Sequence, residues 1–285
     1  MFNAEYERRI DDLVGQWRDE VYEEVLGTQV MPAVKIYAFA SLRDLTDVYD
    51  VSAIFPMFSH QMGELPDHYA NGVFARLSGA CTSICNALQA IRAHMDCHAA
   101  VAAARRAHEA LWQVFWLCNP AVDAGARMNR LVALNKSEIQ EALRFWTGLN
   151  PAIEGQLRGF LGNIQGIAGL PQYKPKDGWI EYMEHFESSV DGSMDDAARS
   201  WSIMSNMTHA NLVFDWIIQS QDDSQDEMDR LQLIPTVDAM GMVGNLCTLI
   251  MERAQIPEEH IVEVNATVGR SWVASRELLG LRRRE

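Results

Sequence analysis

The chain has few basic residues for its length. Lys and Arg together number 24 against 39 Asp and Glu, which gives a formal net charge of −15. Because neutralising nucleic-acid phosphates requires clustered Lys and Arg, this balance excludes a broad, nonspecific nucleic-acid surface. It leaves room for a local basic pocket, so RNA stays a candidate partner that the net charge disfavours.

Cysteine is scarce, and long apolar runs are lacking. The five cysteines lie mostly in apolar helical sequence, which favours reduced, buried thiols over a disulfide framework. The first residues, MFNAEYERRIDDL, are charged throughout and do not resemble a signal peptide. No apolar run reaches the roughly 18 residues that a membrane span requires. We therefore expect a cytoplasmic protein without a membrane partner.

Motifs of the common catalytic classes are also missing. There is no Gly-rich phosphate loop, no Gly-x-Ser-x-Gly elbow and no His-Glu-x-x-His zinc helix, so we expect no cofactor. One acidic run, Asp222, Asp223 and Asp226, has the spacing of the magnesium-binding aspartates of terpene cyclases. A solvated helix end is the favoured interpretation of this run, and a metal site is the weaker alternative.

Helical periodicity runs through most of the chain. Apolar residues recur at helical intervals in residues 4–26 and again in residues 261–279, and no series of alternating β segments occurs. These patterns predict an all-α fold, a bundle of about eight to ten helices that forms a single domain over residues 1–285.

Breakers and caps predict where the helices end. We expect Gly27 to stop the first helix, Ser137 to begin a helix through a capping box, and Pro235 to begin another. Several Gly and Pro residues within 155–178 predict a long loop, or a seam between two halves of the chain.

Two expected helices carry ionisable residues amid apolar ones. They are His98–Cys118 and Ala197–Ser220. An unpaired buried charge is costly, so one interpretation is an internal ion pair and a core histidine. The functional interpretation is a pocket in which a histidine transfers protons and an arginine holds an anionic group. On that interpretation the candidate catalytic residues are Arg105, Glu109, Ser205 and His209, and the candidate substrate-binding residues are Arg106 and Arg199.

Two segments carry a family resemblance. The sequence ARRAHEALWQVFWLCNPAVDAGARMNRLVAL and the later RSWSIMSNMTHAN together resemble a group of uncharacterised actinobacterial all-helical proteins, over about residues 90–215. That group is distantly similar to HEPN-like helical bundles. The resemblance implies a dimer and metal-independent RNA cleavage at an Arg-x(4–6)-His motif. Arg92 with His98 and Arg253 with His260 have that spacing, whereas nine residues separate Arg199 from His209.

Three functions remain open at this point, and with them the question of whether the chain is an enzyme. The first is a HEPN-like ribonuclease or toxin-like domain, as the resemblance implies. The second is a small-molecule enzyme or binding protein with an apolar cavity lined by some of the 8 Trp and 14 Met residues. The third is an interaction protein without catalysis, acting alone or as a homodimer.

Overall fold

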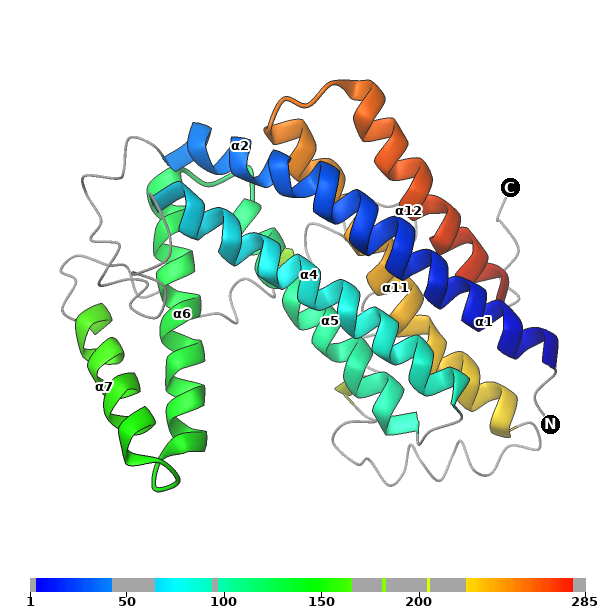
Figure 1. Ribbon diagram of the computed structural model, residues 1–285, viewed down its shortest axis with the longest axis horizontal. Helices are drawn as coiled ribbons and strands as arrows, with labels where there is room; N and C mark the ends of the chain where they lie inside the picture. The colour runs from blue at the N-terminus through cyan, green and yellow to red at the C-terminus, as the bar shows by residue number, and fades with distance from the viewer. Residues whose placement is uncertain are drawn as a thin grey trace.

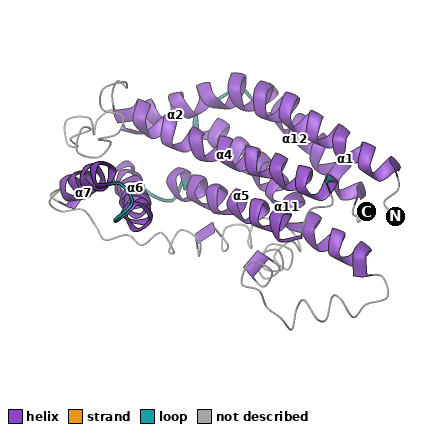
Figure 2. Ribbon diagram, turned by 60° about the horizontal axis from the view of Figure 1, so that its bottom comes forward, coloured by secondary structure: helices purple, strands orange, loops and turns teal. Residues whose placement is uncertain are grey.

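A computed structural model describes residues 4–42, 65–93, 97–165, 181–182, 204–205 and 224–278 of the chain. Every extended segment among them is helical, which confirms the all-α prediction (Figures 1 and 2). In chain order the elements are α1 (Ala4–Gln16), η1 (Trp17–Val30), α2 (Met31–Leu42), α4 (Leu65–Arg92), α5 (Cys97–Cys118), α6 (Ala124–Trp146), α7 (Pro151–Gln165), α11 (Ser224–Arg253) and α12 (Glu258–Leu278). Since α1, η1 and α2 are continuous, the described residues form seven helices, fewer than the eight to ten expected for the whole chain.

The first helix does not stop at Gly27, as the sequence predicted. It continues from Ala4 to Leu42 because its middle third, η1, is wound as a π-helix, and the Met31 amide donates to the Leu26 carbonyl five residues back. The wider turn of a π-helix returns residues four or five apart to the same face. The buried residues of η1 have that spacing: Trp17, Val21, Val25, Leu26 and Val30.

Two other predicted boundaries, at Ser137 and Pro235, are also wrong, and the predicted loop or seam at 155–178 is described only in part. Ser137 lies inside α6, whose start is capped instead by the Asp123 carboxylate, which accepts from the Ala126 amide at 2.7 Å. Part of the predicted loop at 155–178 is helix α7, and residues 166–178 lie outside the described residues. Pro235 lies in the interior of α11 and not at its start.

Helix α4 lies at the centre of the described bundle. It contacts α5, α11, α2, α1, η1 and α6. Two of its hydrogen bonds to other helices are fully buried: the Trp17 indole donates to the Cys81 carbonyl at 3.3 Å, and the Tyr69 hydroxyl donates to the Leu117 carbonyl at 2.6 Å. Several small residues of α4, among them Ala70, Ala80 and Ala87, are buried against its neighbours.

The α6–α7 hairpin projects from one end of the bundle. The long axes of α1, α2, α4, α5 and α12 run roughly together, whereas α6 and α7 cross that direction (Figures 1 and 2). Helix α7 packs chiefly against α6. Its buried residues Leu157 and Ile164 still belong to the same hydrophobic core as the rest of the bundle.

The thiols that the structure describes are free, as predicted. Cys81, Cys118 and Cys247 are buried, and Cys85 is half-buried. Burial raises the pKa of Cys247 to about 12, so this thiol is protonated and unreactive at neutral pH.

Candidate functional site

Arg105 and Glu109 form the ion pair that the sequence predicted, but the pair is not buried. Arg105 Nε lies 3.0 Å from Glu109 Oε1 along one turn of α5, and 24% and 44% of the two side chains are exposed. An exposed i,i+4 pair of this kind contributes a few tenths of a kcal/mol. The interpretation of these two residues as a core ion pair is therefore wrong.

The buried ionisable residue of α5 is His108 instead. Its Nε2 lies 2.9 Å from the Pro235 carbonyl of α11, and the side chain is 1% exposed. Burial lowers the pKa of His108 to about 4, against the smaller opposing effect of the hydrogen bond to Pro235. His108 is thus neutral at pH 7 and donates from Nε2, which makes it a structural link between α5 and α11.

Part of the second predicted site helix lies against α5. Met204 is buried in a small cluster with Ala87 of α4 and with Val101 and Ala104 of α5, and Ser205 beside it is half-buried. Ser205 therefore lies near the α5 turn that precedes Arg105. The other members of the predicted site, His209 and Arg199, lie outside the described residues.

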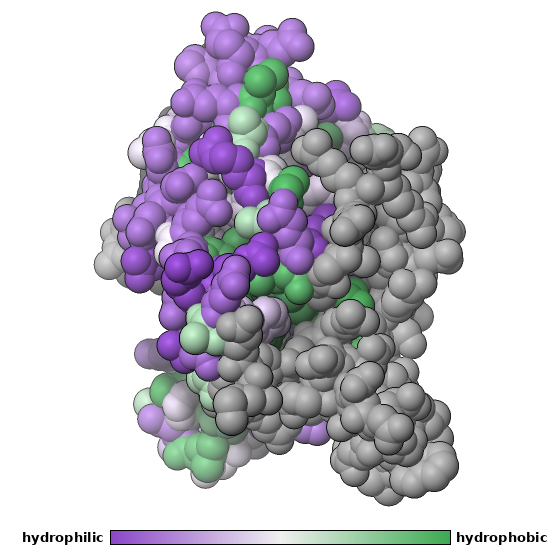
Figure 3. Space-filling view, turned by 90° about the vertical axis from the view of Figure 1, so that its right-hand side faces the viewer, coloured by the Kyte–Doolittle hydropathy of each residue, from purple (hydrophilic) through white to green (hydrophobic). Residues whose placement is uncertain are grey.

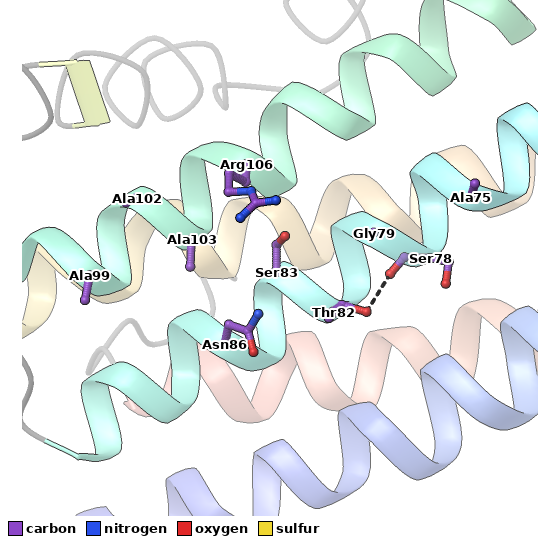
Figure 4. Close-up of a pocket in the computed structure, with 10 residues that line it drawn as sticks. All are labelled: Ala75, Ser78, Gly79, Thr82, Ser83, Asn86, Ala99, Ala102, Ala103 and Arg106. Carbon is purple, nitrogen blue, oxygen red and sulfur yellow. Dashed lines mark hydrogen bonds between the residues drawn. The ribbon is translucent and has the colours of Figure 1, made fainter. Parts of the chain in front are cut away.

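The remaining predicted residue, Arg106, lines a groove between α4 and α5 (Figure 4). The groove has a volume of about 600 Å³. It is lined by Ala75, Ser78, Gly79, Thr82, Ser83 and Asn86 of α4 and by Ala99, Ala102, Ala103 and Arg106 of α5. Arg106 is the only charged residue among these described lining residues, and no described carboxylate forms an ion pair with it.

The spacing of the lining residues explains why the groove exists. On each helix they recur at intervals of three and four, so they lie on one face. Small side chains on two facing helical stripes cannot fill the space between the helices. At Gly79 no atom lies within 4 Å of the position that a Cβ would occupy. The hollow is thus open at its middle.

The polar groups of the groove differ in how they are satisfied. The Thr82 hydroxyl donates to the Ser78 carbonyl at 3.0 Å, and the Ser78 hydroxyl donates to Tyr22 of η1 at 3.0 Å. Ser83 and Asn86 lie beside them, and Ser83 points from α4 toward the Arg106 side chain of α5 in Figure 4. One guanidinium, one hydroxyl and one amide therefore converge on the same hollow.

Sequence reasoning missed both the α4 half of this groove and a second polar cluster. Arg130 of α6 is 4% exposed and donates to the Trp116 carbonyl and to the Glu181 carboxylate, each at 2.8 Å. The Asn119 amide donates to the same carboxylate at 3.0 Å. The hydrogen bonds of this cluster join α6 to the end of α5 and to Glu181, so we assign it a structural role.

The described residues do not support a metal site. They contain no group of three or more His, Cys, Asp or Glu side chains arranged to hold an ion. The weaker alternative of the sequence analysis stays untested, because Asp222, Asp223 and the side chain of Asp226 lie outside the described residues.

Two residues with the HEPN-like Arg–His spacing, Arg92 and His260, each lie near an acidic side chain. Arg92 Nε lies 3.1 Å from an Asp11 carboxylate oxygen, which ties this arginine to α1. His260, which follows Arg253 at the required spacing, is exposed in the first turn of α12, with Glu263 3.9 Å away. Comparison with protein-family models, with curated proteins and with solved structures finds no match for this chain.

Two helices are long and apolar enough to cross a membrane, by length and composition alone. They are Ala4–Leu42 and Leu231–Arg253. In the second, 61% of the apolar window is buried inside the bundle, as in the core helix of a soluble protein, and in the first 44% is buried. The length and composition of these two helices do not establish that the chain crosses a membrane.

Proposed function

We propose that this chain is a helical binding protein that holds an anionic ligand on Arg106 in the α4–α5 groove. The observation that carries the proposal is the exposed guanidinium, set in a hollow of about 600 Å³ without a carboxylate partner among the described residues. The chain has 39 acidic side chains, and none of the described ones forms an ion pair with Arg106, which leaves this guanidinium available to a ligand.

The lining favours a carboxylate or a phosphate on a small polar body. A guanidinium presents a planar set of donors that matches either group, and such charge-assisted hydrogen bonds are stronger than neutral ones. Ser83 and Asn86 offer neutral donors on the opposite wall. Among the described residues the groove is lined by no Trp or Met, so the apolar-cavity version of the small-molecule hypothesis is not the one we propose.

The resemblance to HEPN-like bundles supports a second version of the same proposal, in which the anion is an RNA phosphate. In that version Arg106 binds the phosphate, and His209 transfers the proton during cleavage. The net charge of −15 and the engagement of Arg92 with Asp11 speak against it. We therefore propose ligand binding first and RNA cleavage second, in a cytoplasmic protein.

A thermal-shift screen of the purified chain tests the proposal. The panel holds inorganic phosphate, di- and tricarboxylates, nucleoside monophosphates, tRNA and uncharged analogues of the same size. We expect at least one small anion to raise the melting temperature, and the Arg106→Ala variant to lose that shift. The matched control is Arg144→Ala, which removes an exposed arginine outside the groove. An anion that stabilises both variants equally would place the binding site elsewhere.

RNA cleavage is measured on the same material. Degradation of tRNA by the wild-type chain, lost in His209→Ala, would favour the ribonuclease version. Intact tRNA at high protein concentration would remove it and would leave the binding proposal standing.

A further inference from the structure

Three polar side chains of the α4–α5 groove are not used by the described part of the protein. Arg106, Ser83 and Asn86 line the groove, and within the described residues none of them forms a side-chain hydrogen bond or an ion pair. The other polar side chains of the lining, Ser78 and Thr82, each donate to another group of the protein. A ligand in the groove therefore meets one cation, one hydroxyl and one amide that are ready to bind it.

Two further arginines near the groove are already engaged. Arg105, which precedes Arg106 on α5, is paired with the Glu109 carboxylate at 3.0 Å. Arg76, next to the first lining residue of α4, donates to the Glu138 carboxylate and also, at 2.7 Å, to a side-chain oxygen of α5. Within the described lining, a ligand can thus pair with a single positive charge.

The charge around the groove disfavours a second negative charge on the ligand. Helix η1, whose Tyr22 accepts from Ser78 of the lining, belongs to residues 4–30, which carry eight acidic and three basic side chains. The described surface at the end of the molecule where these residues begin is largely hydrophilic (Figure 3). A phosphate ester carries about two negative charges at neutral pH, whereas a carboxylate carries one. One guanidinium neutralises the carboxylate but leaves the phosphate with excess charge beside acidic side chains.

The two neutral groups lie on one wall of the groove, one helical turn apart. Ser83 points toward the Arg106 guanidinium, and Asn86 follows on α4 after a rise of about 4.5 Å (Figure 4). A carboxyamide side chain both donates and accepts, so the neutral group that matches it at both ends is another amide. On the facing wall, the methyl groups of Ala99 and Ala103 point from α5 toward α4 and offer an apolar contact.

We propose that the ligand of this groove is a monocarboxylate with an amide beside the carboxylate, the arrangement found in an N-acylated amino acid. The carboxylate binds Arg106 and accepts from Ser83, the amide exchanges hydrogen bonds with Asn86, and the acyl end lies on the alanine methyl groups. The short covalent path from the carboxyl carbon to the amide oxygen spans up to about 5 Å, close to the rise between the two neutral residues. This inference rests on the proposed function, because it assigns the chemical class of the anion bound at Arg106.

A set of small probes separates recognition of the charge from recognition of the amide. N-acetylglycine has both features, N-acetylaminomethylphosphonate has the same body with a dianion, 4-oxopentanoate has a methylene in place of the amide N–H, and N-acetylglycinamide is neutral. Ligand-observed NMR titration of the full-length chain, at a pH of about 8 where the phosphonate is a dianion, measures each Kd.

We expect N-acetylglycine to bind most tightly and the neutral amide to show no binding. The Kd of 4-oxopentanoate should be about two- to tenfold higher, because one hydrogen bond is lost. The phosphonate should also bind more weakly than N-acetylglycine, by a factor that shrinks as added salt screens the acidic side chains around the groove.

Variants of the groove identify the residues responsible. Asn86→Ala should raise the Kd of N-acetylglycine about two- to tenfold and remove its advantage over 4-oxopentanoate. The matched control is Gln89→Ala, which removes an exposed amide of α4 outside the groove and should leave both dissociation constants unchanged. Arg106→Ala should weaken the binding of every anionic probe. Circular dichroism confirms that each variant is folded.

The inference and the proposed function fail in different ways. Tighter binding of the phosphonate than of N-acetylglycine, or a preference for the amide that survives in Asn86→Ala, would overturn the inference and leave anion binding at Arg106 standing. The same holds if no probe binds while another anion of the thermal-shift screen binds and depends on Arg106. Anion binding that Arg106→Ala never weakens would remove both.

Discussion

His108 donates a hydrogen bond to the carbonyl of Pro235 across the contact between α5 and α11, with 2.9 Å between nitrogen and oxygen. A proline inside a helix removes one hydrogen-bond donor and clashes with the preceding turn. The histidine thus binds α11 at the residue that cannot donate a backbone hydrogen bond of its own. Since the ring is buried and neutral, this link depends on pH.

The first prediction concerns acid stability. The pKa of His108 is lowered from 6.5 to about 4 on folding, so the unfolded state binds the proton more tightly. The stability that neutral His108 contributes is fully present above pH 6.5 and is lost as the pH falls toward 4. The loss amounts to about 3 kcal/mol by proton linkage. Urea denaturation at a series of pH values measures it.

The control for this prediction is His108→Gln, which can donate a similar hydrogen bond but does not titrate. We expect its free energy of unfolding to fall less steeply between pH 6.5 and pH 4. Parallel curves for the two proteins would show that His108 does not cause the loss.

The second prediction contrasts two ion pairs. Arg130 is almost fully buried beside Glu181, whereas Arg105 and Glu109 are both partly exposed. Glu181→Ala leaves a buried guanidinium without its carboxylate and should cost about 2–4 kcal/mol of unfolding free energy. Glu109→Ala should cost less than about 0.5 kcal/mol. Equal losses in chemical denaturation would contradict the burial described for the two pairs.

The third prediction is that alanine substitutions at two helical glycines, Gly241 and Gly15, change the stability of the chain in opposite directions. A Cβ on Gly241 of α11 would lie 3.1 Å from the Trp272 indole nitrogen of α12, whereas nothing lies within 4 Å at Gly15 of α1. Gly241→Ala should therefore destabilise the chain by about 1–3 kcal/mol, through forced separation of the two helices. Gly15→Ala should stabilise it by about 0.5–1 kcal/mol, because alanine restricts the unfolded chain and favours the helix. The melting temperatures of the two variants, measured by thermal unfolding, test this prediction.

The periodicity of the sequence was enough to predict the helices but not their boundaries. Helix α5 begins and ends almost where its apolar pattern does. Gly27, Ser137 and Pro235 were expected to mark ends because local propensity favours ends there, yet each lies inside a helix whose buried face continues past it. Packing energy summed over several turns exceeds the cost of one unfavourable residue.

The candidate site was predictable only in part, for a related reason. Arg105 and Arg106 were selected because they interrupt an apolar run, and both belong to the surface of α5. Their different roles depend on neighbours that periodicity does not reveal: Glu109 pairs with the first, and the small residues of α4 leave a hollow beside the second. Ser83 and Asn86 carry no signal of their own, since small polar residues are common on helix surfaces.

The fourth prediction concerns a substitution that fills the groove. Gly79 lies at the middle of its α4 wall with open space above it, so Gly79→Leu should place a side chain in the hollow. Binding of the anion should be lost, while the melting temperature of the unliganded chain should stay the same or rise. A binding affinity that survives this substitution would show that the ligand does not enter the groove.

The most direct test of the central claim is calorimetric titration of the best anion from the screen into the wild type, Arg106→Ala and Arg144→Ala. Loss of a charge-assisted hydrogen-bonding partner costs about 1.5–3 kcal/mol, so Kd should rise roughly tenfold to a hundredfold in Arg106→Ala. It should stay at the wild-type value in Arg144→Ala. Equal dissociation constants for the wild type and Arg106→Ala would contradict the assignment of the α4–α5 groove as an anion-binding site.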